Sequence, residues 1–378
     1  MNKHKNACIF FLIFFLYISC VISSNYKSAA PVNAPAKITL ASVQEEETQE
    51  DQERELPSAM VYYEEPVLNI FFHALVARPE TAFTSSRKDH FLEWYVTAEE
   101  YKKILNELYK KDYVLTDIKE LYEVINTNGH KRVNFKKPYI PLGKKPMVLS
   151  IDDLSYYESV RRLASIHKLV IDDNNHIAGW TADGSSGELS YDLDAVTYLE
   201  EFIGMYPDFS VRGARGIIAL TGFEGVLGYR THELNSHSYQ EEKENAIRVV
   251  NRLKELGWHF ASHSWGHPNL REISLTRLEN DMNRWDREVR PVLGDTDLFI
   301  YPYGSGVEHI EAKHKILRDK NFNVFFGVGP GFTLLQRQSY LYFDRRNIDG
   351  FYFRVFRNRA DRLFNIEDVI DAEARQAK

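Results

Sequence analysis

The sequence predicts an α/β fold from about residue 61 onward. Short apolar runs rich in β-branched and aromatic residues alternate with amphipathic helical stretches along this part of the chain. A content of 44% hydrophobic and 13% aromatic residues in 378 is enough to bury one large core or two modest ones. The net charge is −7, and the Lys and Arg residues are scattered. We therefore expect a globular protein with no nucleic-acid partner.

The N-terminal segment has the features of an export signal. Residues 1–24 begin with a short basic stretch and continue with the apolar run 7–16. Three outcomes stay open for this segment: cleavage after Ser23 or Ser24, lipidation at Cys20, or retention as a membrane anchor that tethers the protein. Each outcome predicts an extracellular or cell-surface protein.

The next segment has the composition of a solvated linker. Residues 25–60 combine Ala, Pro, Ser and Asn with an acidic run and show little apolar periodicity. Both cysteines, Cys8 and Cys20, lie before this linker, so no disulfide and no cysteine zinc site can form after it. We expect residues 61–378 to form the catalytic domain.

Strands and helices alternate through this domain in the expected order. The predicted strands lie at 67–72, 146–151, 216–220, 258–261, 298–301 and 322–326. A helix begins after Thr97, which can form a capping box with Glu100. Further helices are predicted over 193–203 and 246–256, and the second of these ends at Gly257.

A turn-rich insertion is expected at about residues 170–214. It contains runs of Asp, Asn, Ser and Gly, whose side chains or positive φ angles favour turns. Four histidines outside the motifs described next fall in predicted loops or on helices. We expect these to be exposed to solvent: His232, His237, His309 and His314.

Polar groups of unusual type follow three of the predicted strands. Asp152 and Asp153 follow the second strand, His263 and His267 follow a later strand, and Tyr303 follows the next one. In barrel-like α/β folds the active site lies at this end of the strands. Two histidines four residues apart can bind one metal ion, and a carboxylate completes a three-ligand site that is open to water. Because neighbouring side chains point in opposite directions, one aspartate is left free for proton transfer.

Either motif alone is common in surface turns, so their joint position at strand ends carries the prediction. At these residues the sequence resembles the polysaccharide deacetylases of carbohydrate esterase family four, the NodB homology group. The resemblance covers about residues 61–356. The matching segments are Ser150–Asp153, His263–His267 and Tyr301–Gly304, the last as in one branch of the family.

This resemblance implies a distorted (β/α) barrel of the NodB homology type and a metal-dependent hydrolase. Asp153, His263 and His267 would bind a divalent metal, and Asp152 would be the base that deprotonates a metal-activated water. Tyr303 would donate its backbone N–H to the oxyanion. The reaction would remove N-acetyl groups from an extracellular or cell-wall polysaccharide.

Several positions depart from the family pattern. Leu154 replaces a usual glycine, and Ile300 replaces an arginine that orients the base. Arg345 or Arg346 could supply that charge from a later strand end, and we take Arg346 into the expected site.

The usual late histidine, the general acid, is also missing. His73, at the end of the first strand, is the expected substitute. Trp265 and Trp180 are expected to contact the sugar, because aromatic rings suit the apolar face of a pyranose.

Two alternatives to N-deacetylation stay open. The same site could cleave O-acetyl esters of glycans, or the chain could be a non-catalytic, metal-containing glycan-binding protein. Two imidazoles and a carboxylate suit one zinc ion and also accept cobalt, nickel or iron.

Overall fold

The computed structural model describes residues 59–128, 130–183, 186–360 and 362–376. The expected export signal at 1–24 and nearly all of the expected linker at 25–60 lie outside these residues. Among the described helices, none has the length and apolar character that crossing a membrane requires.

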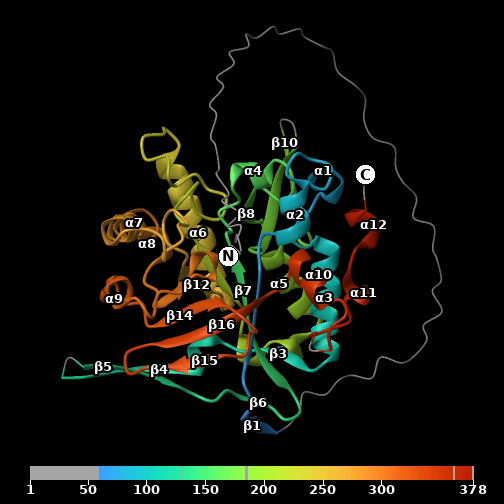
Figure 1. Cartoon of the computed structure of the whole chain (residues 1–378). Helices are drawn as coiled ribbons and strands as arrows, with labels where there is room; N and C mark the ends of the chain where they lie inside the picture. Colours follow the sequence, from blue (N-terminus) through green and yellow to red (C-terminus); the bar gives the residue numbers. More distant parts are fainter. Residues whose placement is uncertain (1–58, 129, 184–185, 361, 377–378) are drawn as a thin grey trace, which may run out of the picture. The chain divides into compact units, whose positions relative to one another are not determined.

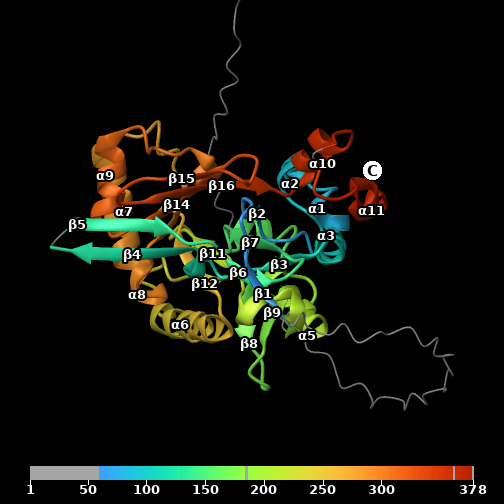
Figure 2. The same ribbon diagram turned by 90° about the horizontal axis from the view of Figure 1, so that it is seen from below.

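Parallel strands close into a barrel, which confirms the expected α/β barrel. Within the described residues, the ring is formed by β2 (Leu68–Phe72), β7 (Lys145–Asp152), β11 (Ile217–Leu220), β12 (His259–Ser262), β13 (Leu298–Ile300), β14 (Val324–Val328) and β16 (Leu341–Asn347). Each strand pairs with the next strand in this order, including β7 with β11. The pairing of the last strand, β16, with the first, β2, closes the ring (Figures 1 and 2). All carboxyl ends therefore meet at one rim.

The strands are apolar on both faces because both faces are covered. Along β11, Ile217 and Ala219 belong to the cluster that fills the barrel, whereas Ile218 and Leu220 belong to the larger cluster under the helices. The helices that cover the barrel are α3 (Ala98–Lys110), α5 (Ala195–Met205), α6 (Tyr239–Leu256), α7 (Leu275–Glu288) and α9 (Glu311–Asp319).

The expected ends of two helices are confirmed. The Thr97 hydroxyl accepts the Glu100 N–H, and the Glu100 carboxylate accepts the Thr97 N–H, so the capping box before α3 is complete. Helix α6 ends at Gly257, whose φ of +106° is the left-handed conformation that glycine adopts without strain.

Shorter elements complete the described domain. Its other helices are α1 (Pro79–Ala82), α2 (Lys88–Trp94), α4 (Glu158–Arg161), α8 (Arg290–Leu293), α10 (Gly350–Phe356), α11 (Ile366–Val369) and α12 (Ala372–Arg375), with 3₁₀ turns η1 (Ile118–Leu121), η2 (Pro207–Phe209), η3 (Val211–Gly213) and η4 (Pro302–Gly304). The additional strands are β1 (Met60–Tyr62), β3 (Tyr113–Leu115), β6 (Tyr139–Pro141) and β15 (Leu334–Gln336). The hairpin of β4 (Tyr122–Thr127) and β5 (His130–Phe135) extends away from the barrel in Figures 1 and 2.

The insertion at 170–214 contains more regular structure than expected. Strands β8 (Lys168–Ile171), β9 (Ile177–Asp183) and β10 (Ser186–Ser190) form a small antiparallel sheet. Asp172 makes the expected turn, because its carboxylate accepts the Asn174 and His176 N–H groups.

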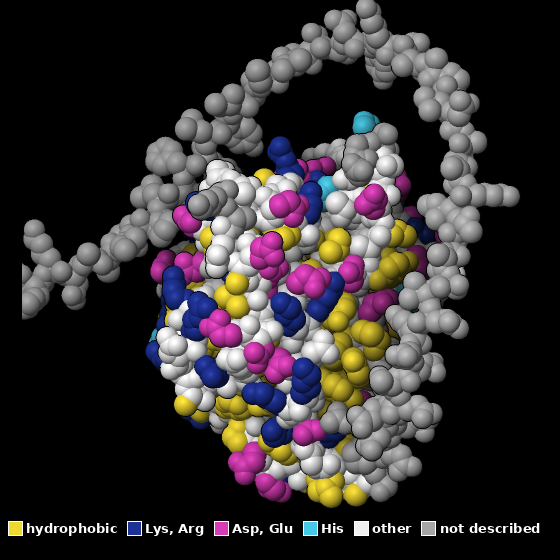
Figure 3. Space-filling view, turned by 90° about the vertical axis from the view of Figure 1, so that its right-hand side faces the viewer, with side chains coloured by type: hydrophobic (Ala, Val, Ile, Leu, Met, Phe, Trp, Pro, Cys, Tyr) yellow, Lys and Arg dark blue, Asp and Glu magenta, His cyan; other side chains and the backbone are white. Residues whose placement is uncertain are grey.

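The expectation that His314 is exposed is wrong. Its side chain is fully buried, and its ring packs edge-on against Phe325 and Tyr340. Burial lowers the pKa of His314 to about 4, so the ring is neutral at physiological pH. On the face seen in Figure 3, Lys and Arg side chains are interspersed with Asp and Glu.

Candidate active site

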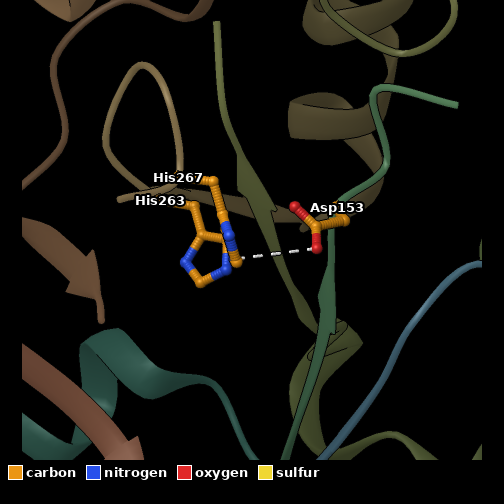
Figure 4. A group of neighbouring side chains, drawn as sticks. All are labelled: Asp153, His263 and His267. Carbon is orange, nitrogen blue, oxygen red and sulfur yellow. Dashed lines mark ion pairs between the residues drawn. The ribbon is translucent and has the colours of Figure 1, made fainter. Parts of the chain in front are cut away.

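The barrel rim brings together three of the expected site residues. Asp153 directly follows β7, and His263 directly follows β12, with His267 four residues later. One ligand atom from each of these side chains lies within 4.8 Å of the other two. Figure 4 shows both imidazoles facing the Asp153 carboxylate, with the dashed line between His267 and Asp153. We call these three residues the triad.

Hydrogen bonding fixes the ring of His263. Its Nδ1 lies 2.8 Å from the carbonyl oxygen of Ile300, at the end of β13, so Nδ1 carries the proton and donates it. The Nε2 lone pair is then available to a metal, an arrangement typical of metal-binding histidines. Ile300 thus contributes through its backbone, while its side chain belongs to the barrel interior.

Unusual backbone conformations place the other two triad residues. Asp153 has a φ of 62°, and His267 has a φ of 52°, both in the left-handed region that costs a non-glycine residue energy. The Ser264 hydroxyl accepts the His267 N–H. Burial lowers the pKa of His267 to about 4, which keeps the imidazole neutral and able to donate its lone pair.

Asp153 is ionised in this environment. Burial alone would raise the pKa of its carboxyl group, but His267 and His263 lower it more, and the result is about 2. The Tyr157 hydroxyl donates a hydrogen bond of 2.7 Å to Asp153 Oδ1. The carboxylate is therefore charged and oriented before any ligand arrives.

The triad fits a divalent metal. When two side chains bind one zinc ion in tetrahedral geometry, their donor atoms lie about 3.3–3.6 Å apart. His267 Nε2 and Asp153 Oδ2 are 3.8 Å apart. Two imidazoles and one carboxylate form an open donor set, and within the described residues these three side chains are close enough to share one ion.

Asp152 is held apart from the triad by an arginine. Arg345, on β16, donates from both terminal nitrogens to the two Asp152 oxygens, at 2.8 and 2.9 Å. Both side chains are buried. Burial alone would raise the pKa of Asp152, but the charge of Arg345 lowers this pKa by a larger amount. The net shift is downward, and Asp152 is an ionised carboxylate at neutral pH.

The choice of Arg346 as the charge beside Asp152 is wrong, and Arg345 takes that place. Successive side chains of a strand point to opposite faces. Arg346 therefore points away from Asp152: its Nε donates to the Pro330 carbonyl, and its guanidinium lies over the Phe356 ring. The guanidinium beside Asp152 is thus supplied from β16 by Arg345.

Tyr303 lies beside the triad as expected. It has a φ of 57°, its ring centroid is 4.5 Å from that of His267, and its side chain is largely exposed. In the described part of the chain, the Tyr303 N–H has no hydrogen-bond partner. This free donor at the rim can bind an oxyanion.

His73 also borders the site. Its Nδ1 lies 3.1 Å from the Trp94 carbonyl oxygen, and its ring packs near Tyr95. It acts electrostatically on Asp152, Asp153 and His267, which places its ring within range of both Asp152 and the triad.

Two residues near His73 were not singled out from the sequence. His90, on α2, packs against Tyr95, and burial lowers the pKa of His90 to about 4. Asp349, which caps α10, interacts electrostatically with His73. Neither belongs to a short motif, so only the folded chain reveals that they lie near the site.

The two tryptophans occupy different places. Trp265 lies between the triad histidines in sequence, and its Nε1 donates to Glu288. Trp180 lies on β9 of the small sheet, where it contacts His167 and Lys168. Among the described residues, none of its ring contacts reaches the triad, so the structure gives no support for Trp180 at the site.

Comparison with known proteins identifies the segment that carries both histidines. Residues 234–324 match the polysaccharide deacetylase family. The expected resemblance is confirmed. The matched segment includes His263, His267 and Tyr303, and it supports deacetylation of glycans as the chemistry of this chain. No curated protein matches the chain.

Solved structures of polysaccharide deacetylases are also similar to this chain. A Streptococcus pyogenes deacetylase in complex with acetate has 14% identity and a TM-score of 0.40, over 75% of this chain and 93% of the other. A Bacillus cereus polysaccharide deacetylase has 12% identity and a TM-score of 0.43, over 76% and 66%.

Proposed function

We propose that this protein is a metal-dependent hydrolase that removes N-acetyl groups from an extracellular or cell-wall polysaccharide. The observation that carries the proposal is the triad with Asp152 beside it: an open donor set next to a separate, ionised carboxylate. A protein that only bound glycan would have no use for a second buried carboxylate beside the first, where like charge makes it costly.

Each side chain has a chemical role in this proposal. Asp153, His263 and His267 would hold the metal, which polarises the acetyl carbonyl and activates a water when bound. Asp152, kept ionised by Arg345, accepts a proton from the attacking water. The Tyr303 N–H donates to the developing oxyanion.

His73 completes the proton transfer in this proposal. An imidazole can donate a proton near neutral pH, and the leaving amine needs one. The hydrogen bond between Nδ1 and the Trp94 carbonyl leaves Nε2 as the nitrogen that can act on the substrate.

Zinc is the proposed metal, because it accepts two imidazoles and one carboxylate with an open fourth position. Cobalt, nickel or iron could bind the same donors. The extracellular setting rests on the sequence of residues 1–24.

The assay is acetate release from an N-acetylglucosamine hexamer and, in parallel, from acetylated xylan. We expect release from the hexamer and none from xylan. Release from xylan alone would assign the chain to O-acetyl esters instead. Binding of the hexamer without release from either glycan would favour a non-catalytic glycan-binding protein.

A further inference from the structure

A hollow lies on the outer side of the loop that carries the triad histidines. Its volume is about 610 Å³. Two aromatic rings line it, Phe223 from the loop after β11 and Trp265 from the histidine loop. The remaining lining residues come from that loop and from α7: Gly266, Pro268, Arg277, Asn280, Asp281, Asn283, Arg284 and Arg287.

The arginines of this hollow form a stripe along α7. Arg284 follows Arg277 by seven residues, and Arg287 follows Arg284 by three. These spacings place all three on one side of the helix. Arg284 already has partners, because it donates to Glu288 and its guanidinium lies 3.2 Å from the centre of the Trp265 ring. The guanidinium groups of Arg277 and Arg287 are exposed and have no ion pair or hydrogen bond with any described residue. The hollow therefore offers two guanidinium groups that are not hydrogen-bonded within the described residues, although Arg277 lies close enough to Asp281 to interact with its charge.

The acidic groups nearby are already occupied. Both oxygens of Asp281 accept backbone N–H groups, from Trp265 and from Gly266, at 2.8 Å. Glu288 accepts from Arg284 and from the Trp265 indole. These bonds fix the histidine loop against α7. The three guanidinium groups of the stripe outnumber the carboxylates of Asp281 and Glu288, so the hollow keeps a net positive charge.

A row of aromatic rings joins the hollow to the triad. The Tyr157 hydroxyl donates to Asp153, the Tyr157 and Phe223 rings are 5.7 Å apart, and the Phe223 and Trp265 rings are 6.5 Å apart. A side chain at Gly222 would place its Cβ 2.2 Å from the Trp265 ring, so this position permits the close packing. The exposed Phe223 ring offers a face on which a sugar ring can lie, whereas the Trp265 ring is covered by the Arg284 guanidinium.

We infer that this hollow is a subsite for a sugar that carries an anionic group, a carboxylate or a phosphate, next to the N-acetylated sugar at the triad. The inference rests on the proposed function for the position of the acetylated sugar. Guanidinium groups bind both kinds of anion in bidentate geometry, and the exposed Phe223 ring offers an apolar face to the sugar. An acidic glycan is then bound more tightly than a neutral one of the same length.

The test compares the equilibrium affinities of three proteins for two oligosaccharides by calorimetry. A hyaluronan hexasaccharide carries carboxylates and N-acetyl groups, and an N-acetylglucosamine hexamer is neutral. The full chain is compared with the double variant Arg277→Gln, Arg287→Gln. The control, Arg132→Gln with Arg359→Gln, removes the same charge from exposed positions far along the sequence from α7. A chelator is present, so no acetyl group is released during the titration.

We expect the stripe variant to bind the carboxylated probe at least about tenfold more weakly than the full chain. Its affinity for the neutral hexamer should not change, and the control should behave as the full chain with both probes. Equal losses in the stripe variant and the control, or no loss in either, would overturn the subsite.

Inorganic phosphate serves as a competitor in the same titration. Displacement of the carboxylated probe by phosphate, dependent on the two arginines, would assign the subsite to a phosphate-bearing sugar. Arginine-dependent binding of the carboxylated probe without competition would assign it to a uronate-type sugar. Arginine-dependent binding without any acetate release from metal-loaded protein would contradict the proposed function and leave the subsite standing.

Discussion

The two neighbouring aspartates of the rim have different surroundings. Asp153 turns toward His263 and His267, whereas Asp152 is paired with Arg345. The sequence predicted that adjacent carboxylates would separate, because side chains alternate along a strand. It could not decide between Arg345 and Arg346, because that depends on which face of β16 turns to the site.

Removal of Arg345 should change the pH profile of the reaction. In Arg345→Gln the charge that lowers the pKa of Asp152 is gone, so this pKa should rise and the acidic limb of kcat/KM should move to higher pH. The variant should also unfold more easily, by about 3–5 kcal/mol, because a buried carboxylate loses its partner. The checks are a pH–rate profile and urea unfolding. An unchanged acidic limb in folded variant protein would contradict Asp152 as the base.

The pH dependence of stability has a definite sign for the same pair. The folded pKa of Asp152 lies below its unfolded value, so the pair stabilises the fold above an unfolded pKa of about 3.9 and ceases to do so as the pH falls through the folded value. The wild-type protein should therefore lose more stability on acidification than Arg345→Gln does.

At the scale of elements, the sequence predicted the strands and helices of the barrel better than the small sheet of β8 to β10. Continuous apolar runs such as 146–151 and the capping box of α3 follow local rules, and both are confirmed. Strands β8 to β10 were not predicted within the turn-rich insertion, and β10 lacks an apolar pattern because most of it is exposed. His314 shows the same limit, since a lone histidine on α9 carries no local sign that it faces Phe325.

Helix α10 should be sensitive to a single added methyl group. A Cβ at Gly350 would lie 1.7 Å from the Leu92 carbonyl oxygen, so Gly350→Ala should destabilise the protein by about 1–3 kcal/mol in urea unfolding. Gly204, in the last turn of α5, has open space around its Cβ position. Gly204→Ala is the matched control and should be neutral or stabilising, by up to about 1 kcal/mol. Equal effects of both substitutions would contradict the described packing of α10.

At the scale of the whole described domain, the C-terminal helix holds one wall of the site. Arg375 donates to the carboxylate of Glu100 and to the carbonyl groups of Leu92 and Tyr95. These carbonyls flank Trp94, whose own carbonyl orients His73. No sequence pattern links positions so far apart along the chain, which is why this support could not be predicted.

Arg375→Ala should reduce both stability and turnover. Glu100 is fully buried, so the loss of its partner should cost about 3–5 kcal/mol, and a displaced Trp94 carbonyl should lower kcat more than it raises KM. Arg354→Ala removes an exposed pair with Glu93 and should cost about 0–1 kcal/mol. Urea unfolding and steady-state kinetics on both variants provide the comparison. An unchanged kcat in Arg375→Ala would show that α12 does not support the site.

The central claim is that a metal at the triad and a base at Asp152 act together on an N-acetylated glycan. The most direct test measures bound metal and acetate release in the same preparations of wild-type protein, His263→Ala and Asp152→Asn. We predict that His263→Ala loses both metal and activity, whereas Asp152→Asn keeps the metal and loses activity by about 10²–10⁴-fold. Equal metal loss in both variants, or acetate release by wild-type protein that a chelator does not affect, would contradict the claim.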